Sequence, residues 1–124
     1  NLLLELKEKY GITILFISHD LSVVSYISDR VGVMYGGMLM EETNASSIMT
    51  KHYHPYTKLL YSSVIGNNEN VSFEKNDSEV ANLVVPMSGC PFANRCPMAD
   101  NFCKEAIPQM KEISAGHRVA CHKI

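Results

Sequence analysis

The stretch Thr13-Ile14-Leu15-Phe16-Ile17-Ser18-His19-Asp20 carries the strongest fold signal in the chain. Residues 12–17 are apolar except for Thr13, and they lie between Gly11 and the polar Ser-His-Asp sequence. A short apolar run of this kind predicts a strand that is buried on both faces, as in a parallel sheet covered by helices. We therefore predict an α/β fold.

Helix and hairpin signals lie on both sides of this segment. Before it, apolar residues recur at helical spacing from residue 2 to residue 10, and Gly11 is a typical helix stop. After it, Asp20 is the predicted N-cap of a short helix that ends near residue 28. Two strands, Arg30–Tyr35 and residues 38–41, are predicted around Gly36-Gly37, because a tight turn needs positive φ at both positions.

Two more helices are predicted before the composition changes. Asn44 can cap a short helix through residue 49, and Pro55 opens a longer one whose apolar face is lined by Tyr56, Leu59, Leu60 and Val64. From residue 67 the chain is rich in Asn, Glu, Ser, Asp and Lys, which is typical of a linker. We predict three parts: an α/β part over residues 1–65, a linker over 66–84, and a small irregular Cys-rich extension over 85–124 that needs a covalent or metal staple.

The composition is that of an ordinary globular protein. The chain has 124 residues, of which 46% are hydrophobic and 19% charged, and with a net charge of −2 nothing argues for a nucleic acid or an anionic membrane surface as partner. No apolar run is long enough to cross a bilayer, and no secretory signal is visible, so we expect a cytoplasmic protein. Because the sequence starts at Asn1 inside a helical pattern, we also expect a fragment of a longer chain.

His19 is the first candidate functional residue. Ligands of open α/β sheets bind beyond the carboxyl ends of the strands, where His19 is predicted to lie. An imidazole at this place can donate a hydrogen bond to a phosphoryl oxygen or hold an attacking water. Alternatively, His19 only helps to cap the following helix. The spacing alone leaves both interpretations open.

A family resemblance adds to these arguments. The segment Thr13-Ile14-Leu15-Phe16-Ile17-Ser18-His19-Asp20-Leu21 resembles the H-loop of ATP-binding-cassette (ABC) ATPases, and Ser28-Asp29-Arg30-Val31 and Val33-Met34-Tyr35-Gly36-Gly37 are similar to the segment that follows it. The stretch Lys51-His52-Tyr53-His54-Pro55-Tyr56-Thr57-Lys58-Leu59-Leu60 resembles the subgroup that energises peptide, dipeptide and nickel importers. Thr43 departs from that subgroup, which usually has Gly there, but the change affects a turn and no chemistry.

The resemblance implies a fold and an activity. The α/β part would be the C-terminal edge of a P-loop ABC ATPase core, and His19 would contact the γ-phosphate of ATP and couple hydrolysis to dimer closure. The phosphate loop, the Walker-B acid and the signature sequence of the family match no residues of this chain. We therefore expect ATP and Mg²⁺ to be ligands of the longer protein only. The fragment alone is expected to be inactive.

The resemblance also implies partners and a place in the cell. The longer protein would be the ATP-hydrolysing subunit of an importer for oligopeptides or dipeptides, at the inner face of the membrane. It would pair with a second ATPase subunit and with two transmembrane permease subunits. The fragment is expected to self-associate, because it would expose core surface. The transported solute is not specified by the sequence, and the assignment depends on His19 lying at the end of an interior strand.

All four cysteines lie in the last 35 residues, at Cys90, Cys96, Cys103 and Cys121, with five, six and seventeen residues between them. Four thiols close together in an intracellular protein indicate a shared ligand more than disulfides. Zinc is one candidate, although the close Cys-x-x-Cys pairs of structural zinc sites are absent. A [4Fe–4S] cluster, which accepts ligands from wider loops, is the other. Metal-free thiols are a third possibility.

The cysteine tail resembles the C-terminal extension of the same importer ATPases, which is associated with an iron–sulfur cluster. The similar residues are Gly89-Cys90-Pro91-Phe92-Ala93-Asn94-Arg95-Cys96-Pro97-Met98, then Cys103, then Gly116-His117-Arg118-Val119-Ala120-Cys121-His122. The resemblance thus favours a [4Fe–4S] cluster on the four cysteines, with a structural role.

Other histidines are weaker candidates. His52 and His54 stand two residues apart, but a metal pair is less expected there than surface and capping roles. His117 and His122 flank Cys121, so either could replace a thiol ligand. Two rival functions remain: a free-standing metal- or iron–sulfur-stapled module that binds a protein, and a complete small enzyme that uses His19.

Overall fold

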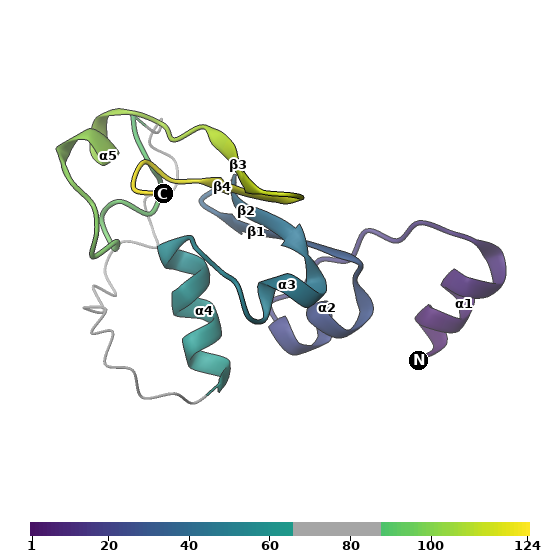
Figure 1. The fold of residues 1–124 in the computed structure, drawn as a ribbon. Coiled ribbons are helices and arrows are strands. Elements are labelled where there is room, and N and C mark those ends of the chain that lie inside the picture. Colours follow the sequence, from purple (N-terminus) through teal and green to yellow (C-terminus); the bar gives the residue numbers. More distant parts are fainter. Residues whose placement is uncertain (66–87) are drawn as a thin grey trace.

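The structure is a computed structural model that describes residues 1–65 and 88–124 (Figure 1). The predicted linker over 66–84 lies outside the described residues. The helices are α1 (Leu2–Tyr10), α2 (Leu21–Ile27), α3 (Ala45–Ile48), α4 (Pro55–Ile65) and α5 (Asn101–Glu105). The strands are β1 (Arg30–Tyr35), β2 (Met38–Asn44), β3 (Met110–Ser114) and β4 (His117–Ala120), and they form one antiparallel sheet in the order β1-β2-β4-β3. The fold therefore combines helices with an antiparallel sheet.

The central strand pair joins parts of the chain that are far apart in sequence. β2 pairs with β4, with Glu41 opposite Val119 and Glu42 opposite Arg118. β3 and β4 form a hairpin whose turn contains Gly116, at φ 71°. This hairpin was not predicted from the sequence, so the Cys-rich extension is less irregular than expected.

The hairpin of β1 and β2 was predicted correctly. Gly36 and Gly37 have φ values of 57° and 79°, which is the conformation that a tight turn between antiparallel strands requires. β2 runs on to Asn44, three residues beyond the predicted end. The extra residues matter because they bring Glu42 and Thr43 into the sheet.

The main core lies between β1 and the helices α2, α3 and α4, which are drawn below the sheet in Figure 1. Its buried members are Val31, Val33, Ala45, Ile48 and Tyr61. α4 begins at Pro55, as predicted. Tyr61, however, was not on the predicted apolar face, and its side chain is 1% exposed. Its hydroxyl lies 3.3 Å from Oγ of Ser25, so the one polar atom of this buried ring has a partner.

The helix ends near the N-terminus follow the predicted capping chemistry. Gly11, which has a left-handed φ of 61°, is the C-cap of α1. Asp20 caps α2, since its carboxylate accepts hydrogen bonds from the backbone N–H groups of Ser22 and Val23. No helix in residues 1–65 or 88–124 is long and apolar enough to span a membrane.

The strand predicted for residues 12–17 is absent. This segment runs without regular structure between α1 and α2 (Figure 1). The side chains of Leu15 and Ile17 are each 89% exposed, so the prediction of a buried strand was wrong for this structure. The physical reason is that a strand needs a hydrogen-bonded neighbour, and no described segment pairs with this one.

Candidate functional site

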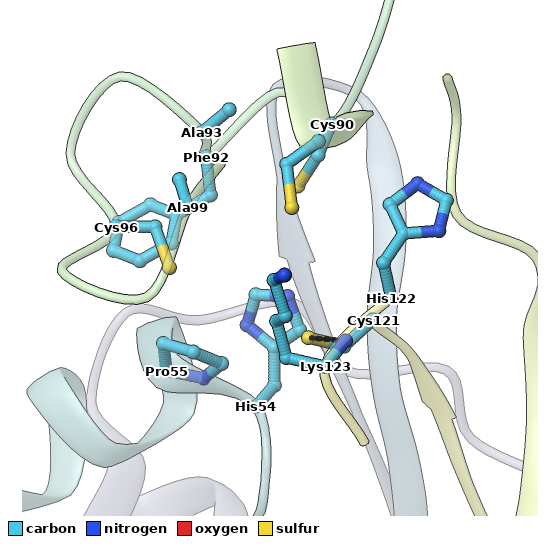
Figure 2. A pocket seen from close by; sticks show the side chains of 11 residues that line it. His54, Pro55, Cys90, Phe92, Ala93, Cys96, Ala99, Cys121, His122 and Lys123 are labelled. Atoms are coloured by element: carbon cyan, nitrogen blue, oxygen red, sulfur yellow. Dashed lines mark hydrogen bonds between the residues drawn. The ribbon is translucent and has the colours of Figure 1, made fainter. Parts of the chain in front are cut away.

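The side chains of the four cysteines line one small cavity of about 10 Å³. Figure 2 shows the sulfur atoms of Cys90, Cys96 and Cys121 facing the same space as the imidazole of His54. The cysteines come from three places: the loop after residue 88, helix α5, and the residue after β4. The fold therefore gathers the four thiols that the sequence analysis grouped together.

Backbone contacts explain why the loop and α5 meet. The N–H of Cys90 donates to the carbonyl of Cys103 at 2.8 Å. Gly89 makes this approach possible, because a Cβ at that position would lie 2.4 Å from backbone atoms of Lys104. Asp100 caps α5 by accepting from the N–H of Cys103 at 3.0 Å, and the same carboxylate is paired with the Lys123 ammonium.

Backbone amides approach three of the four sulfur atoms. Burial raises the pKa of the Cys90 thiol, and a hydrogen bond from the N–H of Phe92 opposes this rise. Burial likewise raises the pKa of Cys96, with the N–H of Met98 in opposition. The N–H of Lys123 lies 3.4 Å from Sγ of Cys121, the contact dashed in Figure 2. In each case the amide is two residues after the cysteine, and amides so placed favour a negatively charged sulfur.

The donor set suits a thiolate-bound metal in kind but does not form a preorganised metal site. All four thiols are free, and they are the ligand type of zinc and iron–sulfur sites. Yet within residues 1–65 and 88–124, no three His, Cys, Asp or Glu side chains are close enough together to hold a metal ion. The cavity has room for about one water molecule, so a larger group requires the sulfurs to move apart.

His54 lines the same cavity and is 1% exposed. It precedes α4, and its Nδ1 accepts a hydrogen bond from the N–H of Tyr56 at 3.0 Å. Burial lowers the pKa of His54 from 6.5 to about 4, although the charge of Glu41 acts in the opposite direction. The capping role considered for His54 is confirmed, but its expected place on the surface was wrong. The Nδ1 of His52 contacts the carbonyl of Ile48 at 3.1 Å.

Glu41 is a buried acceptor that the sequence analysis missed. Its side chain is fully buried, and it accepts hydrogen bonds from the backbone N–H groups of Tyr53 and His54, each at 2.9 Å. Its Oε1 also lies 2.6 Å from Nε2 of His117. This carboxylate thus ties β2 to β4 and to the start of α4. In the sequence, only the alternation of inward- and outward-facing side chains along β2 could have indicated that Glu41 is buried.

The two histidines near Cys121 differ in position. His117 is bound to Glu41 and is not among the side chains that line the cavity. His122 does line the cavity, and its Nε2 lies 2.8 Å from the carbonyl of Ala106. Both rings therefore already have partners in the fold.

His19 lies apart from the four-cysteine cavity. It is exposed at the end of the irregular segment, next to the Asp20 that caps α2. Among the described residues, its ring has no hydrogen-bond partner. The structure does not bring His19 and the cysteines into one site.

Comparison with known proteins adds a family and several relatives. The family model described as "Oligopeptide/dipeptide transporter, C-terminal region" matches residues 40–103, which include three of the four cysteines. Over 126 residues the chain is 47% identical to the oligopeptide transport ATP-binding protein AppF of Bacillus subtilis and 44% identical to the putative oligopeptide transport ATP-binding protein YkfD of the same species. It is 41% identical over 123 residues to a putative peptide import ATP-binding protein of Brucella ovis.

These matches cover a much larger share of this chain than of its relatives. Each covers 98% of this chain but only 38% of the two Bacillus proteins and 39% of the Brucella protein. The chain therefore spans about two fifths of the length of the relatives that it matches.

Proposed function

The chain belongs to the family of oligopeptide/dipeptide transporter C-terminal regions, and on that premise we propose that it is the carboxyl-terminal part of an ATP-binding subunit of an oligopeptide or dipeptide importer. The observation that carries the proposal is the match over 98% of the chain to proteins named for peptide transport and ATP binding. These names do not favour the rival proposal of a free-standing protein-binding module. The whole subunit would bind ATP and Mg²⁺.

His19 is proposed to contact the γ-phosphate of ATP in the whole subunit. Its exposed ring at the start of α2 is compatible with this role, as is the uncovered apolar segment before it, which leaves room for the rest of an ATPase core. A positioned donor to a phosphoryl oxygen accelerates transfer by stabilising charge in the transition state.

The test uses the full-length subunit together with its transport partners. His19→Ala should lower ATP hydrolysis by about 100-fold and leave nucleotide affinity within a few fold. His52→Gln is the control, because that ring faces a carbonyl of the same chain. A His19→Ala protein that hydrolyses ATP at the normal rate would exclude this role. The 124-residue chain alone should show no saturable ATP binding by calorimetry.

The partners and location follow from the same proposal. The subunit would pair with a second ATPase subunit and bind two transmembrane permease subunits at the inner face of the membrane. Affinity purification of the tagged full-length protein from membranes, followed by mass spectrometry, should recover permease subunits. Recovery of the protein without any membrane protein would contradict this arrangement.

The four cysteines are proposed to hold a [4Fe–4S] cluster that braces the C-terminal extension. The gathering of the four thiols around one cavity supports this proposal, as do the amides that face three of the sulfurs, but the sulfurs would have to move apart to admit the cluster. When bound, the cluster would supply cross-links between the loop, α5 and the end of β4. Zinc is the second candidate, because a single ion needs less room than a cluster.

Chemical analysis separates the candidates. Protein purified without oxygen should contain iron and acid-labile sulfide in a one-to-one ratio, and Cys103→Ser should lose most of both. Zinc without sulfide would favour the second candidate. Fresh anaerobic protein that contains neither iron nor sulfide would disprove the cluster.

A further inference from the structure

The backbones of Cys90 and Cys103 are in direct contact. The N–H of Cys90 donates to the carbonyl of Cys103 at 2.8 Å, and a Cβ at Gly89 would lie 2.5 Å from the same carbonyl oxygen. In an antiparallel sheet, residues that share backbone hydrogen bonds have Cα atoms roughly 5.5 Å apart. The Cα atoms of a disulfide are roughly 4.4–6.8 Å apart. A disulfide can therefore span the distance that this backbone contact sets between the two cysteines.

The side chains of both residues face the same space. Each lines the cavity of about 10 Å³, and Figure 2 shows the sulfur of Cys90 directed into it. The same view shows the sulfurs of Cys96 and Cys121 well apart from that of Cys90. A disulfide holds its two sulfurs about 2 Å apart. Pairing of Cys90 with Cys103 would therefore contract the cavity, whereas a metal group would require it to widen.

The two thiols differ in their access to solvent. Cys90 is half-buried, and Cys103 is 6% exposed. An oxidant dissolved in water therefore meets Cys90 first. Burial raises the pKa of Cys90, but the N–H of Phe92 hydrogen-bonds its sulfur and favours the reactive thiolate. Cys103, which is held beside Cys90 on α5, is placed to react with the oxidised sulfur.

We propose that Cys90 and Cys103 form a redox-sensitive pair in the metal-free chain, which hydrogen peroxide converts to a disulfide between the loop after residue 88 and α5. The bond would replace a contact that is now held by a backbone hydrogen bond. It would also occupy two of the four thiols, so the oxidised chain could no longer bind a metal through all of them. The proposal does not depend on the cluster, because it concerns the chain without metal.

The reaction takes place in two steps. The Cys90 thiolate attacks one oxygen of the peroxide and the O–O bond breaks, which leaves a sulfenic acid on Cys90 and a hydroxide ion that takes up a proton to become water. The Cys103 sulfur then attacks the sulfenic sulfur, its proton goes to the leaving oxygen, and a second water is released. Two thiols thus lose two electrons, and one peroxide is reduced to two waters.

Peptide mapping of the wild-type chain tests the pairing. The chain is first freed of metal with a chelator and a thiol reductant, both are removed, and an equimolar amount of hydrogen peroxide is added. After alkylation of the remaining thiols, trypsin together with a protease that cuts before Asp100 places Cys96 and Cys103 on separate peptides. Mass spectrometry should show one main cross-link, between Cys90 and Cys103. The oxidised chain should melt about 5–15 °C above the reduced chain, because the bond closes a loop of the unfolded chain.

Two variants separate the proposed partner from a neighbouring thiol. Cys103→Ser should lose the main cross-link, and a sulfenic acid should then be trapped on Cys90 by dimedone. Cys96→Ser should form the cross-link at close to the wild-type rate. The wild-type chain oxidised in urea should give a mixture of pairs, because the folded backbone contact is lost there. This control does not depend on the variants folding.

Three results would overturn the proposal. The first is a main cross-link from Cys90 to Cys96 or Cys121 in the folded chain. The second is oxidation of the thiols without any disulfide, and the third is the same distribution of pairs with and without urea. Iron and sulfide are measured before the metal is removed, so the cluster can be disproved while the thiol pair stands, and the reverse also holds.

Discussion

Oε1 of Glu41 and Nε2 of His117 lie 2.6 Å apart in the interior, although 76 positions separate the two residues in sequence. Both side chains are almost completely buried, at 0% and 4% exposure. The contact joins the hairpin of β3 and β4 to β2. The same carboxylate accepts hydrogen bonds from the backbone N–H groups of Tyr53 and His54, just before α4. A single acidic side chain therefore connects three elements of the fold.

Glu41→Gln should destabilise the chain strongly. The amide has one acceptor oxygen in place of two, so at least one of the three buried donors loses its partner. We expect the free energy of unfolding to fall by about 2–4 kcal/mol in urea denaturation followed by circular dichroism. Glu42→Gln is the matched control. Its carboxylate pairs with Arg30 and Arg118 near the surface, so its loss should cost less than about 1 kcal/mol. Equal effects of the two substitutions would contradict the role given to Glu41.

Acidification should destabilise the metal-free, reduced chain partly through His54. Its folded pKa is about 4, below the ordinary value of 6.5, so the unfolded chain takes up the proton more readily. The free energy of unfolding should therefore fall as the pH drops from about 6.5 to about 4, by up to roughly 3 kcal/mol from this residue. His54→Asn removes the titrating ring, so its stability should depend less on pH over this range. Parallel curves for the two proteins would show that burial does not shift this pKa.

Gly89→Ala should disturb the cysteine site through the backbone. The new Cβ would lie 2.4 Å from backbone atoms of Lys104, which cannot move aside as a flexible side chain can. A loss of about 1–3 kcal/mol in unfolding free energy is expected, along with faster amide hydrogen exchange at Cys90. In Gly32→Ala, the control, the new Cβ meets only the tip of Leu39, at 2.9 Å. This control should change stability by less than about 1 kcal/mol. If Gly89→Ala changed neither the free energy of unfolding nor the amide exchange at Cys90, the close contact between the loop and α5 would not contribute to stability.

The exposed apolar segment should make the isolated chain associate with itself. Leu15 and Ile17 are each 89% exposed, and Ile12 and Ile14 of the same segment are also exposed. Multi-angle light scattering should show an average mass that rises with concentration. The double substitution Leu15→Lys and Ile17→Lys should reduce this rise, with little effect on stability. A monodisperse monomer across a wide concentration range would contradict the prediction.

Local chemistry allowed much of the fold to be predicted. The cap at Asp20, the turn at Gly36-Gly37 and the start of α4 at Pro55 depend on residues that lie next to one another in sequence. For such features the residue type nearly determines the backbone conformation. The structure confirms each of them.

Pairing between distant segments could not be predicted in the same way. The pattern of residues 12–17 showed a preference for burial, but it could not show whether a neighbouring strand was present. Conversely, β3 and β4 carry weak patterns, and they are strands because β2 offers an edge for pairing. The family assignment was expected to depend on the strand before His19, but the family match covers residues 40–103 and does not include it.

The sequence analysis named the four cysteines of the candidate site, but it could not show how they are arranged in space. All four cysteines line one cavity, and their clustering is visible in the sequence. The role of His54 as a lining residue was not visible, since its proximity depends on how α4 meets the C-terminal extension. Glu41 was missed because an acidic residue in a short strand is usually exposed.

The pairing of β2 with β4 also protects the chain against misalignment. Glu41 is opposite Val119, and His117 is two residues from Val119, so the acid and the imidazole point to the same side of the sheet. If β4 slid by a single position along β2, His117 would turn to the opposite side, and the buried carboxyl group of Glu41 would lose one of its three hydrogen-bond partners. The contact between Glu41 and His117 therefore favours the observed alignment of this short strand.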